Sequence, residues 1–292
     1  MMTLPVPTFD MTADALEREG LLYTHACPFK LPPPGQLEFL RRQEIVAYGH
    51  KDLAFDPQRG RLTGLRKTHP AEARRLADVL AQFSIEATAW VQQTFPTYAS
   101  GLVRDRVMLR TAEEATRTLR LTARNDLFHI DNYPTRATQG RRILRLSVNI
   151  NTTDPQVWAT SERFPQLLAR FAAISRLPAR TEKDWLAPAR PVVRLFTGGR
   201  TGRSAYDAWM LKLHHFLKEN DQFQATAKRR VWTFPPGAAW LLFADGVAHA
   251  QLRGSFTLEH SFFVPVTCLA RPNDAPIAQL TSLSNAAKRQ AG

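Results

Sequence analysis

The sequence has little cysteine, because Cys27 and Cys268 are the only two among its 292 residues. Two cysteines are too few for a disulfide framework or a cysteine metal cluster, so a reducing compartment is expected. No apolar run approaches the roughly 18 residues that a membrane-spanning helix needs. Residues 1–10 also lack the basic start and the apolar stretch of a signal peptide. These absences together predict a cytoplasmic protein.

Negative charge is also scarce: 26 Asp and Glu stand against 39 Lys and Arg, which gives a net charge of +13. Such an excess favours an anionic partner, which is a nucleic acid, an acidic membrane surface or a phosphorylated substrate. Arginine pairs with phosphate and carboxylate through two parallel hydrogen bonds. A solvated basic surface in an arginine-rich sequence is the other interpretation. Charge alone does not choose between these partners.

The pattern of apolar residues divides the chain into helical and strand-rich parts. Apolar residues recur at helical spacing within 70–100, which predicts one long helix or two, with the end marked by Pro96. Strands are expected from residue 107 onward, with a helical insertion at about 155–230. The predicted divisions are a proline-rich irregular segment at 1–40, a helical region at 41–106, a strand-rich core at 107–272 and a tail at 273–292.

Residues 117–130 read as strand-rich, and residues 141–151 show the clearest strand alternation in the chain. Leucine, valine and isoleucine occupy one face of the second segment, and its other face carries Arg145, Ser147, Asn149 and Asn151. Helices first, then strands with an insertion, then more strands are typical of an α+β protein. We therefore predict a double-stranded β-helix, that is, a jelly-roll or cupin-type core.

His129 and Asp131 are one residue apart in an expected strand segment, where their side chains leave the same face. His249 lies far downstream, in an expected turn between two late strands. Two imidazoles and one carboxylate make up the facial triad of non-haem Fe(II) oxygenases, which leaves positions open for a co-substrate and O2. His260 competes for the role of second histidine, whereas His214 and His215 are predicted to be surface or packing residues.

A 2-oxoglutarate oxygenase also needs a cation for the far carboxylate of its co-substrate, because a buried carboxylate requires a partner. Many of these enzymes place an arginine a short way beyond the second histidine, and His260 stands at that position here. Arg145 is the preferred replacement and Arg253 is the second choice. Asn149, on the same polar face as Arg145, is a further candidate for binding the co-substrate.

Several separated segments resemble one family. They are FHIDNYPTRATQGRRILRLSVNIN at 128–151, GRSAYDAWMLKLH at 202–214, FPPGAAW at 234–240, DGVAHA at 245–250 and LEHSF at 258–262. Within residues 40–272 the chain is similar to the Kdo hydroxylases, which are Fe(II)/2-oxoglutarate dioxygenases. These enzymes hydroxylate C3 of the outer 3-deoxy-D-manno-oct-2-ulosonic acid (Kdo) of lipopolysaccharide. The resemblance implies that His129, Asp131 and His249 bind iron. This sequence departs from the family pattern at His260, where glutamine is expected, and at Asn132-Tyr133, where Ala-Phe is usual.

The resemblance also implies the partners: a Kdo-containing lipid A precursor as substrate, a peripheral contact with the inner face of the inner membrane, and no nucleic acid. Arg200 and Arg203 in a glycine-rich loop, together with Arg136 and Tyr133, are candidates for binding the acidic sugar and its phosphorylated lipid. Two alternatives stay open. One is a 2-oxoglutarate oxygenase acting on nucleic acid or protein, and the other is a non-catalytic jelly-roll protein that binds anionic glycolipid. The oligomeric state is not predicted.

Overall fold

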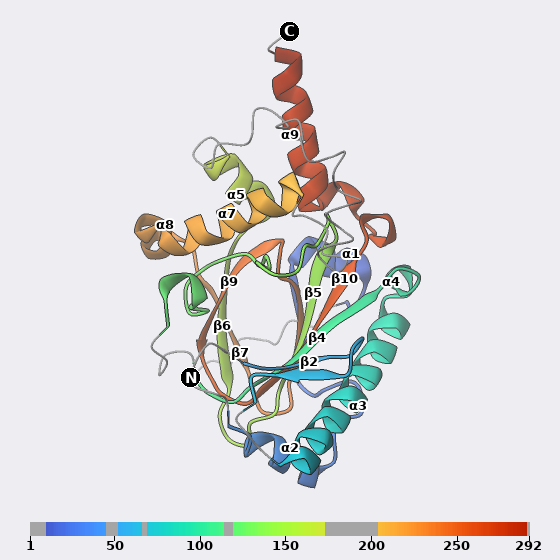
Figure 1. The fold of residues 1–292 in the computed structure, drawn as a ribbon. Coiled ribbons are helices and arrows are strands. Elements are labelled where there is room, and N and C mark those ends of the chain that lie inside the picture. Colours follow the sequence, from blue (N-terminus) through green and yellow to red (C-terminus); the bar gives the residue numbers. More distant parts are fainter. Residues whose placement is uncertain (1–9, 45–51, 66–68, 114–118, 173–203, 291–292) are drawn as a thin grey trace, which may run out of the picture.

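The computed structural model describes residues 10–44, 52–65, 69–113, 119–172 and 204–290, which form two facing antiparallel sheets (Figure 1). The larger sheet has the order β1-β8-β5-β10-β4-β2-β3. Its strands are β1 (Leu21–Thr24), β8 (Ala239–Phe243), β5 (Arg142–Asn149), β10 (Thr257–Val264), β4 (Val103–Arg110), β2 (Leu53–Asp56) and β3 (Arg61–Thr63). The smaller sheet consists of β7 (Arg230–Phe234), β6 (Gln156–Arg163) and β9 (Val247–Arg253), in that order. Two facing antiparallel sheets agree with the predicted double-stranded β-helix.

Aromatic side chains from both sheets fill one part of the space between them. Trp158 on β6 meets Trp240 on β8 edge to face, with ring centroids 5.5 Å apart. Phe234 on β7 stacks face to face on Trp240, with ring centroids 4.2 Å apart. Such contacts stabilise by dispersion and by burial of large apolar areas. They hold the two sheets together and leave the polar row of β5 facing the same interior.

Helices cover the outer face of the larger sheet. α3 (Pro70–Thr94) begins where the His69 side chain accepts a hydrogen bond from the Ala71 backbone, and Pro70 occupies the first helical position. α3 ends two residues before Pro96, which agrees with the predicted end there, and the short α4 (Pro96–Ala99) follows. The buried stripe of α3 packs on the sheet beside α1 (Ala13–Glu19) and α2 (Pro34–Arg41). Figure 1 shows α3 lying along this side of the sheet.

A second group of helices lies beside the smaller sheet: α5 (Phe164–Phe171), α7 (Ala205–Glu219) and α8 (Asp221–Thr226). Their apolar faces form a separate buried cluster with β6 and β9 residues. The C-terminal helix α9 (Pro276–Gln290) extends away from the sheets (Figure 1). Short 3-10 helices span Leu121–Ala123, Val266–Cys268 and Pro272–Asp274. Within the described ranges, no helix is long and apolar enough to cross a membrane.

Three expectations about local structure are wrong. The described part of residues 1–40 is not irregular but contains α1, β1 and the start of α2, and prolines are compatible with a helix because Pro34 occupies a first-turn position. Residues 119–130 form no regular strand; they contain a 3-10 helix and a single bridge at His129. The expected helical insertion begins with β6, which is a sheet strand, and its residues 173–203 lie outside the described ranges.

The pairing of β5 with β10 decides which side chains face the interior. Ser261 lies opposite Arg145, and Glu259 lies opposite Ser147. Directly opposed residues on an antiparallel pair share a face. The intervening residues of β10, including His260, therefore face the opposite side, where α3 covers the sheet.

Candidate metal centre

His129, Asp131 and His249 come together at one buried point. Each contributes one ligand atom, and these three atoms lie within 4.8 Å of one another. His249 is the third residue of β9, not part of the preceding turn as expected, and it forms an antiparallel bridge with His129. The bridge has two backbone hydrogen bonds, of 3.1 and 2.9 Å. The backbone of Asp131 is fixed as well, since its N–H donates to the carbonyl of Ala244 at 2.6 Å.

Backbone carbonyls select the tautomers of both histidines. Nδ1 of His129 lies 2.7 Å from the carbonyl of Leu127, and Nδ1 of His249 lies 3.0 Å from that of Val247. A carbonyl only accepts, so Nδ1 carries the proton of each neutral ring and Nε2 keeps its lone pair. The Nε2 atoms of His129 and His249 lie 3.5 and 3.9 Å from Oδ1 of Asp131. Both lone pairs therefore converge on a carboxylate oxygen.

A cation fits this donor set. Among the described residues, Nε2 of His249 is buried without a hydrogen-bond partner. A buried polar atom that faces another acceptor is satisfied by a metal ion between the two. Two imidazoles and one carboxylate suit iron and leave positions open, whereas structural zinc sites are usually closed by four protein ligands.

The electrostatic environment keeps all three groups in the form that binds metal. Burial lowers the pKa of His249 to about 4. Burial, and then the charge of Lys218, lower the pKa of His129 well below its usual value. Burial opposes the charge of Asp131, but Arg145 and the neighbouring histidines outweigh it and hold the pKa of the carboxyl well below its usual value. At neutral pH the site therefore carries two neutral imidazoles and one carboxylate.

Arg145 joins the candidate metal centre from the polar face of β5. Its Nη2 donates to Oδ2 of Asp131, and its Nη1 lies 3.9 Å from the carboxylate of Glu259. Arg110 on β4 approaches the same carboxylate, with Nε 3.0 Å from Oε2. Burial disfavours the charge of Arg145, but Asp131 and Glu259 outweigh it and raise the pKa of the guanidinium. The structure thus places Arg145 beside the ligand Asp131, whereas its predicted role in binding the co-substrate stays a prediction.

The other residues proposed for the co-substrate lie elsewhere. His260 faces α3, where its Nε2 is 2.8 Å from the hydroxyl of Ser84, so it stands on the wrong side of β10. The amide of Asn149 donates to the carbonyls of Asp154 and Phe234 and accepts from the backbone of Asn151. Both N–H groups of its side chain are therefore used by backbone carbonyls and are not available to a co-substrate. Arg253 ends β9 and is exposed.

Two of the residues predicted to bind substrate lie next to the centre. The hydroxyl of Tyr133 lies 3.4 Å from that of Ser261, and the guanidinium of Arg136 covers the Tyr133 ring at 4.0 Å. Arg136 also pairs with Asp105. The remaining two candidates, Arg200 and Arg203, lie outside the described residues.

Several side chains that support the centre were not found from the sequence. Gln224 on α8 accepts from the backbone N–H of Phe128 at 2.9 Å and donates to the Phe128 carbonyl at 2.9 Å. His214, predicted only as a surface or packing residue, is buried against the His129 ring with centroids 5.2 Å apart. Trp158 stacks parallel to His249 at 6.0 Å. These contacts come from elements that are distant in the sequence, so no local sequence pattern predicts them. Glu259, which pairs with Arg145 and Arg110, could have been predicted from the alternation of β10.

Comparison with known protein families agrees with this geometry. The family described as 3-deoxy-D-manno-oct-2-ulosonic acid (Kdo) hydroxylase has a sequence model that matches residues 7–287. The chain belongs to the Kdo hydroxylase family. The family resemblance of the separated segments is therefore confirmed over nearly the whole chain. Among curated proteins, no sequence matches the chain.

Solved structures of one Kdo hydroxylase, KdoO, are similar to the chain. KdoO is a non-haem Fe(II) alphaketoglutarate-dependent dioxygenase, and its cobalt(II) complex has a TM-score of 0.79 at 28% identity, covering 94% of this chain and 89% of that one. Its complexes with Fe(III) and alphaketoglutarate, and with Fe(III) and succinate, each give 0.78 at 28% identity, covering 94% and 88%. This likeness confirms the predicted α+β fold with a double-stranded β-helix core.

Proposed function

We propose that the protein is an Fe(II)/2-oxoglutarate-dependent dioxygenase that hydroxylates C3 of the outer Kdo sugar of a Kdo-containing lipid A precursor, with succinate and CO2 as co-products. The observation that carries this proposal is the buried convergence of His129, Asp131 and His249 in a member of the Kdo hydroxylase family. The similar protein KdoO has been solved with alphaketoglutarate and with succinate, the co-substrate and its product.

The chain's own residues divide the work. His129, Asp131 and His249 would hold the iron, which together with 2-oxoglutarate and O2 supplies the oxidative chemistry. Arg145 would bind the far carboxylate of 2-oxoglutarate, because its guanidinium is permanently charged and its Nε is buried without a hydrogen-bond partner among the described residues. Tyr133 and Arg136 would line the substrate side of the centre. Trp158 stacks on the His249 ring, and all three ligand side chains are buried, which keeps bulk water from the ligand atoms.

The substrate is lipid-linked, so we also propose that the protein meets it at the inner face of the inner membrane as a peripheral protein. The net charge of +13 supports attraction to an anionic surface.

Mass spectrometry of the reaction products tests the proposed activity. Protein purified without oxygen is incubated with Fe(II), 2-oxoglutarate, O2 and Kdo-lipid A, and a product heavier by one oxygen atom is expected. Asp131→Ala should abolish the product, whereas Asp78→Ala, which removes an exposed carboxylate on α3, should not. If an oligonucleotide or a peptide is oxidised and the lipid is not, the protein is a dioxygenase whose substrate is not the Kdo sugar. A folded, iron-loaded protein that forms no succinate with any of these would be a binding protein.

A further inference from the structure

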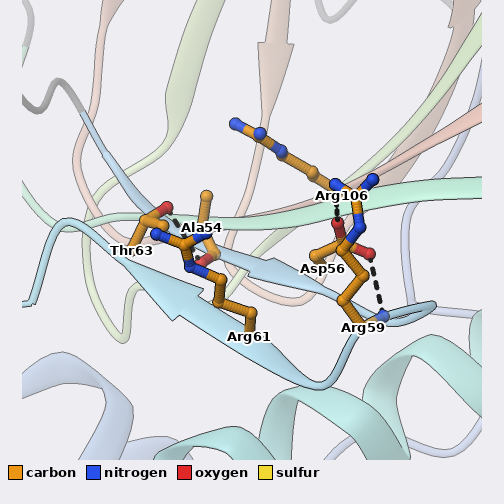
Figure 2. Close-up of a pocket in the computed structure, with 6 residues that line it drawn as sticks. All are labelled: Ala54, Asp56, Arg59, Arg61, Thr63 and Arg106. Atoms are coloured by element: carbon orange, nitrogen blue, oxygen red, sulfur yellow. Dashed lines mark hydrogen bonds and ion pairs between the residues drawn. The ribbon is translucent and has the colours of Figure 1, made fainter. Parts of the chain in front are cut away.

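Two adjoining cavities lie at the β2-β3-β4 edge of the larger sheet. Their volumes are about 140 and 240 Å³, and both are lined by Asp56 and Arg59. We call the two cavities together the arginine trough, because their lining includes Arg59, Arg61, Arg104, Arg106, Arg136 and Arg141. Figure 2 shows the first cavity, where Arg59 lies against Asp56 and Arg106 reaches away from both.

The carboxylates of the trough are fewer than its guanidinium groups. Asp56 pairs with Arg59 at 3.6 Å, and Asp105 pairs with Arg136. The Arg106 side chain is half-buried and has neither an ion-pair nor a hydrogen-bond partner in the described part of the chain. Burial, and then the like charge of Arg136, lower the pKa of Arg106, although the charges of Asp105 and Asp56 oppose this shift in part. An anion that enters the trough would remove this repulsion and give Arg106 a partner.

The trough begins beside the candidate metal centre. Phe263 lines the larger cavity and follows Ser261 by two residues on β10, so it lies about 7 Å further along the strand than the row of Arg145. Tyr133 contacts both Ser261 and Phe263. Its hydroxyl lies 3.4 Å from that of Ser261, and its ring packs edge to face with that of Phe263, with centroids 6.3 Å apart. The guanidinium of Arg141 covers the Phe263 ring at 4.7 Å.

We propose that the arginine trough binds the acidic groups of the glycolipid substrate. Arg106, beside Arg136, offers planar donors that match a carboxylate or a phosphate. The identity of the glycolipid rests on the proposed function, whereas the preference for an oxyanion rests on the trough itself. Arg106 thus fixes the position of the substrate relative to the metal and takes no part in the chemical step.

Equilibrium binding to the metal-free protein tests the trough independently of turnover. Detergent-solubilised Kdo-lipid A should bind Arg106→Gln about 10-fold or more weakly than the wild type, because a charge-assisted pair is lost. Arg106→Lys should recover part of the affinity, since it restores the charge but not the planar fork. Arg74→Gln, which removes an exposed arginine on α3, should bind like the wild type. Equal affinity of Arg106→Gln and Arg74→Gln would overturn the proposal.

Competition identifies which acidic group occupies the trough. Displacement by free Kdo points to the sugar carboxylate, and weaker binding of dephosphorylated lipid points to the phosphate. If the lipid binds equally with and without its phosphates and free Kdo does not compete, the trough does not bind the substrate's acidic groups.

Turnover then separates failure of the trough from failure of the proposed function. Arg106→Gln should raise KM for the glycolipid while kcat, KM for 2-oxoglutarate and the ratio of succinate to product stay as in the wild type. If the wild type hydroxylates the lipid and Arg106→Gln has the same kinetic constants, the proposal for the trough is wrong and the proposed activity stands. If the wild type binds the lipid through Arg106 but does not hydroxylate it, the proposed activity is wrong and the proposal for the trough stands.

Discussion

His129 and His249 face each other across an antiparallel bridge in which each residue donates its backbone N–H to the carbonyl of the other. Their rings lie side by side with centroids 4.6 Å apart. Because the rings are carried by a mutually hydrogen-bonded pair, the separation of the two Nε2 atoms is set before any metal arrives. This arrangement is typical of a site whose ligands are pre-organised by the scaffold.

The first prediction concerns the carboxylate ligand. Asp131→Ala should weaken metal binding by more than about 100-fold, since even loss of an outer partner of a ligand often costs 10–100-fold. Titration with cobalt(II), followed by visible absorption, measures the change, and the exposed Asp78→Ala variant serves as the control. Cobalt affinity that is unchanged in Asp131→Ala would show that the ion binds elsewhere.

The second prediction separates Arg145 from His260 as the partner of the co-substrate. Arg145→Gln should raise KM for 2-oxoglutarate by about 10- to 100-fold, because charge-assisted hydrogen bonds are lost. His260→Gln should leave it unchanged, because His260 faces α3 and contacts Ser84. The measurement is succinate formation as a function of 2-oxoglutarate concentration. The reverse order of effects would contradict the orientation of β10.

The third prediction concerns the buried carboxylate of Glu259, which is fully shielded from solvent between Arg110 and Arg145. Glu259→Gln should destabilise the fold by about 1–3 kcal/mol, since two buried guanidinium groups lose their shared counter-charge while Arg145 keeps Asp131 and Arg110 keeps Asp52 at 3.9 Å. Urea unfolding of the metal-free protein measures the loss. The double variant Glu259→Gln/Arg110→Met should recover part of it, and strictly additive effects would mean that the two side chains do not interact.

The fourth prediction is a pH dependence that arises from His260. Burial lowers the pKa of His260 to about 3, whereas an unfolded histidine titrates near 6.5. Between these values the unfolded chain takes up a proton that the folded protein refuses, so stability falls as pH falls from 6.5 toward 3. The slope from this residue is about 1.4 kcal/mol per pH unit.

His260→Gln tests that slope directly. The unfolding free energy, measured at intervals between pH 7 and pH 4.5, should depend less steeply on pH in this variant than in the wild type. His215→Gln is the matched control, because His215 lies on α7 at a partly exposed position. Parallel curves for the wild type and His260→Gln would show that the imidazole is already charged in the fold.

The centre of the site was predictable from two local patterns: the i, i+2 spacing of His129 and Asp131, although they lie on no regular strand, and the alternation along β5. The spacing of His129 and Asp131 and the polar face of Arg145 followed from local sequence alone, and the structure brings them together. The prediction that His260 binds the co-substrate overlooks Leu258 and Phe262, which have the same parity on β10 and are apolar and buried on the side covered by α3. That signal was present in the sequence, and it excludes His260 from the interior.

Other features depend on contacts that a single segment does not encode. Residues 119–130 resemble strands in composition, but only His129 finds a pairing partner, so the remainder forms turns and a 3-10 helix. Gln224 is an ordinary polar residue of α8 until the fold places it against Phe128. The trough depends likewise on arginines from separate strands and loops, whose meeting is a property of the sheet edge.

The carboxylate of Asp131 has one oxygen on each of two different tasks. Oδ1 faces the two imidazoles, while Oδ2 receives the guanidinium of Arg145. A carboxylate divided in this way would offer a metal only Oδ1, because Oδ2 is held by Arg145. With two imidazole nitrogens and one carboxylate oxygen as its protein ligands, an iron ion would keep open positions for the co-substrate and O2. Arg145 thus limits how many positions the protein itself can occupy.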